Sequence, residues 1–157
     1  DAMLKAHPYQ EAAYDIYELK NDLKEYGIGR VGYLDPPISL GELSENVKRM
    51  LGIDSVNVIG DLRKTIHKAA VCSGNGSDFI GRAYDIGCDA YITGDIGYHD
   101  GCDARDMDLA IIDGGHFGTE NVFMGELVRI LRDSFEQRGL DLNVMLSDTI
   151  RSPFTRV

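Results

Sequence analysis

The sequence predicts an α/β fold: a three-layer α/β/α sandwich around a mixed sheet whose central strands are parallel. Strand-like and helix-like segments alternate along the chain, with no linker or low-complexity stretch between them. Two short runs, 90–93 and 109–113, are too apolar to have a solvated face, as expected for parallel strands that are covered on both sides. The length of 157 residues suits one domain with a substantial core.

The first half of the chain is expected to contribute four strands and one capped helix. Ser39 and Glu42 form a Ser-x-x-Glu capping box, which predicts a helix that begins directly after Pro36 and Pro37. Gly52 is expected to end that helix. Alternation of polar and apolar residues, or short β-branched and apolar runs, predicts strands at 12–19, 30–34, 56–59 and 68–72.

The second half is expected to alternate in the same way. A glycine-rich turn at 73–77 leads into a helix at 78–86, and a long helix is expected at 119–137. The apolar residues of the long helix recur at helical spacing and predict one stripe: Phe123, Leu127, Ile130, Leu131 and Phe135. The remaining strands are expected at 90–93, 109–113 and 142–146.

Composition excludes several classes of partner. A net charge of -10 argues against binding to nucleic acid or to an anionic membrane surface, because both depend on attraction to negative charge. No apolar run approaches the ~20 residues that span a bilayer, and the first residues lack the apolar core of a secretory signal. The cysteines, at 72, 88 and 102, have no paired metal spacing and suit a reducing compartment, so a cytoplasmic location is expected.

Two glycine patterns have opposite contexts. Residues 27–32 match the dinucleotide fingerprint G-x-G-x-x-G, which requires a strand before it and a helix after it. Here a charged segment predicted to be helical, 21–26, precedes the motif and a strand overlaps it, so cofactor binding by this motif is not expected. Residues 73–77 lie between a strand and a helix, and their backbone amides could cradle an anion. No P-loop lysine accompanies them, and a tight turn between strand and helix is the favoured interpretation.

Two histidine–carboxylate pairs share one spacing and one setting. Asp95 and His99 are four residues apart after the run 90–93, and His116 and Glu120 are four apart after the run 109–113. If a helix begins just past each strand, residues at i and i+4 lie on one face. Either pair alone is as readily a solvated surface pair, but two pairs at glycine-rich strand ends favour a functional site. Imidazole and carboxylate are ligands that suit Zn, Fe or Mn.

The residues resemble a known family, the Ngg-interacting-factor-three-like proteins, many of them labelled GTP cyclohydrolase I type II homologues. The resemblance runs along nearly the whole chain, and the whole of 1–157 is similar to the C-terminal half of such proteins. The segments that carry it are Ala6-His7-Pro8-Tyr9-Gln10-Glu11, Tyr14-Asp15, Gly29-Arg30-Val31-Gly32, Val71-Cys72-Ser73-Gly74-Asn75-Gly76-Ser77, Tyr91-Ile92-Thr93-Gly94-Asp95, Tyr98-His99, Gly115-His116-Phe117-Gly118-Thr119-Glu120 and Pro153-Phe154.

The resemblance implies a three-layer α/β fold, a hexameric ring of identical chains and two metal ions in a cleft between two halves. The His-x-x-x-Glu ligands of that family match His116 and Glu120. Its other ligands, which include adjacent histidines, belong to an N-terminal half that this chain lacks, so the chain alone is not expected to complete a dinuclear site. Asp95 and His99 match cleft residues and are expected to support the ligands or to transfer protons.

Two functions of different classes remain open. The first is metal-dependent hydrolysis of a small-molecule substrate, in which metals held partly by His116 and Glu120 lower the pKa of water toward ~7 while Asp95 or His99 moves protons. The second is a non-enzymatic module that forms a ring or binds a partner, with a structural or regulatory metal. Fold alone does not separate them. An open coordination position would indicate catalysis, and a closed one a structural site.

Overall fold

The computed structural model describes residues 2–9, 11–15, 17 and 27–154 of the chain. Within this part, five strands form one mixed sheet in the order β1-β3-β4-β5-β2. They are β1 (Arg30–Ser39), β2 (Asn57–Ile59), β3 (Thr65–Asn75), β4 (Ala90–Gly94) and β5 (Ala110–Asp113). Strands β3, β4 and β5 are mutually parallel, and the edge strands β1 and β2 are antiparallel to their neighbours. The predicted mixed sheet with a parallel centre is confirmed.

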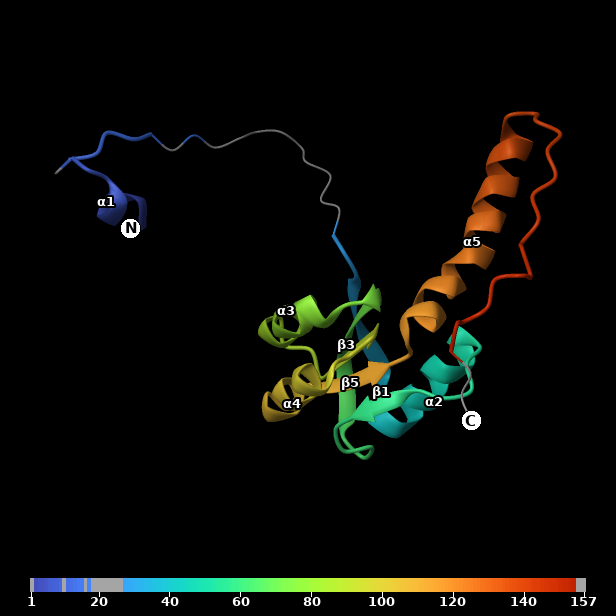
Figure 1. Ribbon diagram of the computed structural model, residues 1–157, viewed down its shortest axis with the longest axis horizontal. Coiled ribbons are helices and arrows are strands. Elements are labelled where there is room, and N and C mark those ends of the chain that lie inside the picture. The colour runs from blue at the N-terminus through green and yellow to red at the C-terminus, as the bar shows by residue number, and fades with distance from the viewer. Residues whose placement is uncertain (1, 10, 16, 18–26, 155–157) are drawn as a thin grey trace.

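Helices cover both faces of this sheet (Figure 1). The helices are α1 (Ala2–Ala6), α2 (Leu40–Leu51), α3 (Ile80–Asp85), α4 (Tyr98–Asp106) and α5 (His116–Gln137), with a 3-10 turn η1 (Ser77–Phe79) before α3. α3 and α4 pack on one face, and α2 packs on the other. The three-layer α/β/α arrangement therefore agrees with the sequence prediction. None of the helices in the described ranges combines the length and hydropathy needed to cross a membrane.

The alternation of side chains along β4 and β5 builds one apolar cluster on each face. Tyr91 and Ile111 point toward α3 and α4, whereas Ala90 and Ile112 point toward α2. Successive strand residues project to opposite faces, so a strand with both faces covered must be apolar throughout. All four residues of β5 are buried, including the carboxylate-bearing Asp113 at its end.

Ser39 caps the start of α2 as predicted. The Ser39 hydroxyl accepts a hydrogen bond from the Glu42 backbone N–H at 3.2 Å. Gly52 follows the helix in the left-handed conformation, with φ 65°. Pro36 and Pro37, which exclude an earlier helix, lie inside β1, and its pairing with β3 is irregular between Tyr33 and Ile38. An edge strand tolerates these prolines, because its outer amides need no partner strand.

Two of the predicted strands are wrong. Residues 12–15 and 17 are in irregular structure, and the rest of the 12–19 prediction falls on residues outside the described part of the chain. Residues 142–146 also form no strand and belong to an irregular C-terminal segment. The predicted turn at 73–77 differs in part, since 73–75 continue β3 and only 77 begins η1. The helix predicted just before Gly27 also lies outside the described residues.

Helix α5 begins three residues earlier than predicted, at His116, and projects beyond the sheet (Figure 1). Only Gly118 and Thr119, in its first turns, are buried. Further along, Phe123 and Ile130 of the predicted apolar stripe are 54% and 45% exposed. These apolar residues do recur at helical spacing, but most of them do not pack against the core, because only the first turns of α5 reach the sheet.

Candidate metal site at the strand ends

The carboxyl ends of β3, β4 and β5 and the first turns of α5 bring the site residues together. Asp95 follows β4 directly, and His116 and Glu120 lie in the first two turns of α5, after β5. Parallel strands place their carboxyl ends at the same edge of the sheet, where open α/β folds bind their ligands. The structure thus places these three residues at the edge of the sheet that the sequence indicated.

His116 lies between two carboxylates. Its Nδ1 is 2.8 Å from Oδ2 of Asp95, and its Nε2 is 3.2 Å from Oε1 of Glu120. About half of each of these side chains is exposed, so the group is open to solvent. The hydrogen bond with Asp95, followed by the charge of Glu120, raises the pKa of His116 above its usual value. In the absence of another cation, this environment favours the imidazolium.

A glycine provides the space beside the two donor atoms. Gly74, near the end of β3, has φ 66°, and a Cβ built on it would lie 2.6 Å from Oε1 of Glu120 and 3.4 Å from Nε2 of His116. Any side chain at this position would occupy the space next to both atoms. A second glycine, Gly94, packs equally closely on the turn before α5, with Gly115 carbonyl carbon 2.6 Å from its Cβ position.

The predicted pairing of Asp95 with His99 is wrong. Helix α4 begins only at Tyr98, and Asp95 precedes it in a left-handed conformation with φ 56°, so the two residues do not share a helix face. Among the described residues, His99 has no hydrogen bond or ion pair with Asp95, and its ring makes an edge contact with Tyr98. The structure thus joins Asp95 to His116 and leaves His99 outside the group.

Two buried side chains that the sequence analysis did not select support the site. Asp113, at the end of β5, accepts hydrogen bonds from the Gly115 N–H at 2.8 Å and the Ile96 N–H at 3.4 Å. Thr119 accepts one from the Gly74 N–H at 2.9 Å. The sequence held one signal for Asp113, a carboxylate at the end of an otherwise apolar strand. A buried acid requires hydrogen-bond partners, so a carboxylate at such a position indicates a specific contact. Thr119 gave no comparable signal.

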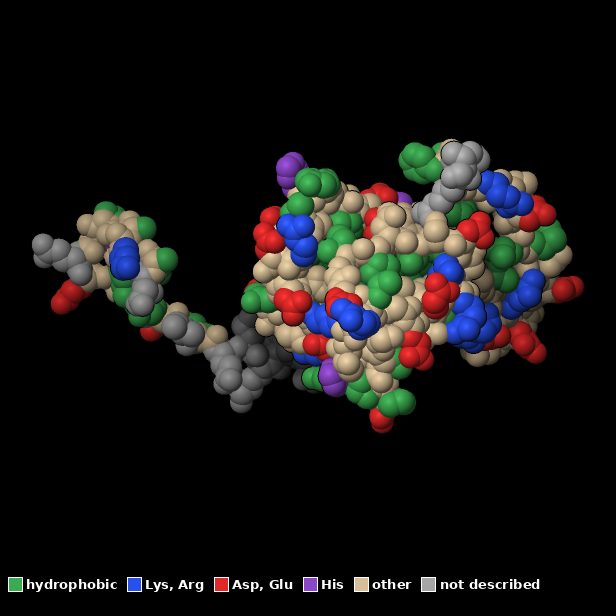
Figure 2. All heavy atoms as spheres, turned by 90° about the horizontal axis from the view of Figure 1, so that it is seen from below, with side chains coloured by type: hydrophobic (Ala, Val, Ile, Leu, Met, Phe, Trp, Pro, Cys, Tyr) green, Lys and Arg blue, Asp and Glu red, His purple; other side chains and the backbone are tan. Residues whose placement is uncertain are grey.

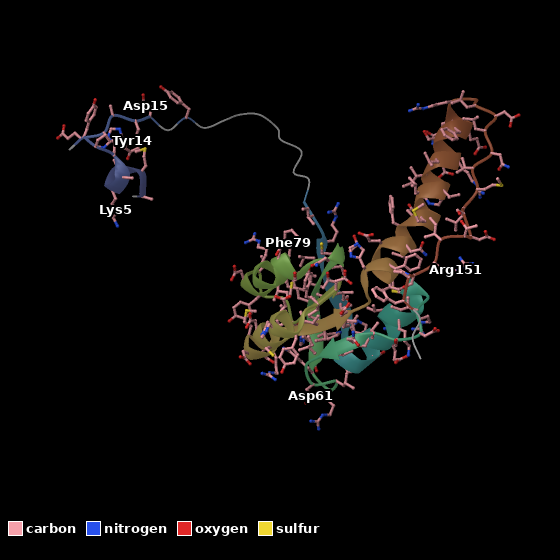
Figure 3. All side chains as sticks on the ribbon, in the orientation of Figure 1. Lys5, Tyr14, Asp15, Asp61, Phe79 and Arg151 are labelled. Atoms are coloured by element: carbon pink, nitrogen blue, oxygen red, sulfur yellow. The ribbon has the colours of Figure 1, made fainter. Side chains whose placement is uncertain are left out.

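The group opens into a pocket of about 1120 Å³ whose described lining contains acids but no lysine or arginine. Its acidic residues are Asp54, Asp95, Asp113 and Glu120, and its apolar side chains are Ile53, Phe117, Pro153 and Phe154. Arg105 lines a separate pocket with Asp61 and Lys64. Figure 3 shows Asp61 at the foot of the sheet, away from the first turn of α5.

Outside this pocket, surface charges of opposite sign lie close to one another. Figure 2 shows acidic and basic side chains interspersed over one face. On α5, Arg129 forms ion pairs with Glu126 and Asp133, as expected for a solvated mixed-charge face. Within the described residues, no group of three or more His, Cys, Asp or Glu side chains is arranged to hold one metal ion. His116 and Glu120 are therefore two potential donor groups and do not make a complete ligand set by themselves.

The fold and this site define the class: a mixed α/β protein with a histidine–carboxylate pair at the carboxyl ends of parallel strands. The chain belongs to the Duf34/NIF3 (NGG1p interacting factor 3) family, which it matches over residues 3–153. It is 36% identical over 155 residues to the GTP cyclohydrolase 1 type 2 homolog of Bacillus subtilis strain 168, a match that covers 99% of this chain and 41% of that protein. The homolog from Clostridium acetobutylicum is 38% identical over 132 residues, or 84% of this chain and 49% of that protein.

Solved structures agree with the sequence comparison. A Bacillus cereus protein related to NIF3 matches with a TM-score of 0.83 and 36% identity, over 99% of this chain and 43% of that chain. Staphylococcus aureus protein SA1388 matches with a TM-score of 0.82 and 28% identity, over 99% and 44% of the two chains. The present chain spans about two fifths of the length of its Bacillus subtilis relative.

Proposed function

We propose that this chain contributes one part of a dinuclear metal site, with His116 and Glu120 as ligands of a divalent cation such as Zn, Fe or Mn. The observation that carries the proposal is the 3.2 Å separation of Nε2 and Oε1 beside the space left by Gly74. Two ligand atoms that each lie about 2.1 Å from one ion are about 3.0 to 3.4 Å apart in octahedral or tetrahedral geometry. The donor pair therefore fits a shared ion.

The hydrogen bonding of His116 supports the same assignment. Asp95 accepts from Nδ1–H, which leaves the Nε2 lone pair facing the Glu120 carboxylate. A lone pair and a carboxylate repel each other unless a cation lies between them. A proton fills that role in the imidazolium, and a divalent metal ion is its natural replacement. Asp95 would then fix the tautomer and the ring orientation of His116, as carboxylates beside metal-binding histidines do.

We infer a hydrolytic activity for the whole protein, to which this chain contributes part of the site. A divalent ion supplies Lewis acidity and a water of lowered pKa. Asp95 holds the Nδ1 proton, and the apolar side of the pocket, formed by Phe117 and Phe154, excludes water from part of a bound small molecule. The remaining ligands would come from the part of the longer relatives that this chain does not span. The names of its relatives suggest a cyclohydrolase-like reaction.

A second candidate, a module that assembles with other chains, is favoured by the exposed apolar side chains of α5 and the segment after it. Phe123, Ile130 and Met145 are 54%, 45% and 76% exposed. An apolar face of this kind is typical of a surface that another chain covers. A ring of identical chains, with the metal in a structural role, would use such a surface.

Metal titration tests the primary proposal directly. Isothermal titration of this chain with Zn²⁺ and Mn²⁺ should show weak binding near one equivalent, lost in His116→Ala and in Glu120→Gln. His99→Ala is the matched control, because His99 is also an exposed histidine near a strand end but lies outside the group. Equal binding by wild type, His116→Ala and Glu120→Gln would contradict the proposal. Turnover of GTP by the longer protein, and its loss on metal removal, tests the hydrolase inference separately.

A further inference from the structure

Thr119 links the strand β3 to the helix turn that carries the two donors. Its Oγ1 accepts a hydrogen bond from the Gly74 N–H at 2.9 Å. The same hydroxyl shares its proton between two carbonyl oxygens, that of Gly115 at 2.9 Å and that of His116 at 3.1 Å. Thr119 is 8% exposed, so water does not readily replace these partners. One hydroxyl thus bridges two segments that are 45 residues apart in sequence.

Gly74 lies where the regular pairing of β3 with β4 is interrupted. The pairing of β3 with β4 shifts register between Val71 and Asn75, so Gly74 lies in the irregular stretch. Its N–H is directed to Thr119, and its carbonyl oxygen accepts from the Thr93 hydroxyl at 3.3 Å. Side-chain hydrogen bonds with Thr119 and Thr93 therefore join the pairing of Asn75 with Gly94 in fixing the position of Gly74 relative to α5.

This position matters because Gly74 forms one wall of the space beside the donor atoms. Its Cβ position is 2.6 Å from Oε1 of Glu120 and 3.4 Å from Nε2 of His116. A shift of Gly74 toward α5 would fill the space, and a shift away would open it to water. The hydrogen bond from the Gly74 N–H to Thr119 thus holds in place one wall of this space.

We propose that Thr119 is a positioning residue whose hydroxyl sets the metal affinity of the His116–Glu120 pair by holding Gly74 against the first turns of α5. The inference rests on the proposed metal-binding function and adds a residue that touches neither the ion nor the substrate. Substitution of groups that support metal ligands commonly lowers affinity by about 10- to 100-fold. Thr119 should fall within this range.

The test separates the role of the Thr119 hydroxyl from the role of its methyl group. Thr119→Val keeps the branched shape, including the methyl that packs near Gly114, and removes the hydroxyl. Thr119→Ser keeps the hydroxyl and removes the methyl. Zn²⁺ titration of the 157-residue chain should show affinity reduced by about 10- to 100-fold in Thr119→Val and close to wild type in Thr119→Ser. The amide signal of Gly74 in a nitrogen–proton correlation spectrum should move in Thr119→Val only.

A buried hydroxyl elsewhere controls for general destabilisation. Ser44, 5% exposed, donates to the Leu40 carbonyl oxygen within α2, and Ser44→Ala should lower the melting temperature while leaving Zn²⁺ affinity unchanged. If Thr119→Val does not fold, Thr119→Ala and Thr119→Ser form a second pair that differs only in the hydroxyl.

Each remaining outcome has a definite meaning. Wild-type affinity in Thr119→Val or Thr119→Ala would overturn the inference and leave the metal-binding proposal intact. Failure of both variants to fold, with normal affinity in Thr119→Ser, would assign the hydroxyl to stability and also overturn it. If wild type binds no Zn²⁺ while all variants fold, the proposed function fails and the inference fails with it.

Discussion

Asp95 and His116 are 21 positions apart in the sequence, yet Oδ2 of one lies 2.8 Å from Nδ1 of the other. This contact joins the turn after β4 to the first turn of α5, and Asp113 braces the same two turns through the backbone amides of Ile96 and Gly115. The contact orients the imidazole so that its second nitrogen faces Glu120. The histidine is thereby held in one orientation and is not a freely rotating surface side chain.

The first prediction concerns the protonation of His116. Its raised pKa should appear as a carbon-bound proton titration above pH 6.5 in the metal-free chain, and Asp95→Asn should lower the midpoint because the largest cause of the shift is removed. A folded-state pKa above the unfolded one stabilises the fold below the unfolded pKa, and this contribution disappears as the pH rises through the folded pKa. An unchanged midpoint in Asp95→Asn would contradict the hydrogen bond.

The second prediction separates ligand from scaffold. His116→Ala should leave the melting temperature nearly unchanged, because about half of the side chain is exposed and its partners can be solvated. Leu40→Ala, in which the fully buried Leu40 is truncated, should instead cost about 2–5 kcal/mol. Thermal unfolding followed by circular dichroism gives both values. A large loss in His116→Ala would show that the histidine is structural.

The third prediction uses a pair of glycines. Gly74 and Gly87 both have positive φ, 66° and 73°, so Ala at either position should cost about 1–2 kcal/mol in backbone strain. Only at Gly74 would the new methyl meet the Glu120 carboxylate, whereas nothing lies within 4 Å of the Cβ position at Gly87. Zn²⁺ affinity should therefore fall in Gly74→Ala and persist in Gly87→Ala. Equal affinities, measured by titration at matched pH, would argue that the space beside Gly74 is not used.

The fourth prediction concerns nucleotide binding. The described lining of the pocket offers four carboxylates and no lysine or arginine, so a triphosphate would meet negative charge. Arg151 lies in the C-terminal segment beside α5 (Figure 3), where its guanidinium donates to the Ile150 carbonyl oxygen. We expect no measurable affinity of the metal-free chain for GTP at physiological salt. Saturable binding at micromolar concentration in calorimetry would overturn this expectation and direct attention to the amides of 73–77.

Features that depend on contacts between residues close in sequence were predicted correctly, and features that depend on distant contacts were not. The capping box of Ser39 and Glu42 was predicted correctly because a cap is a contact over three residues. The His116–Glu120 pair was predicted for the same reason, since both residues lie on one helix. The strands at 12–19 and 142–146 failed because an alternating pattern does not provide a neighbouring strand to pair with. The apolar stripe of α5 was read correctly as a pattern, but the pattern does not say what covers it.

By itself, the sequence determined the order of helices and strands in the core, the apolar character of β4 and β5, and the placement of a histidine–glutamate pair just past a strand end. These features depend on local spacing and on burial. The tertiary structure alone decided that Asp95 pairs with His116 instead of His99, and that Gly74 lies beside the donors and is hydrogen-bonded to Thr119. Such contacts depend on the order of strands in the sheet and on the register of β3, and no local pattern encodes either.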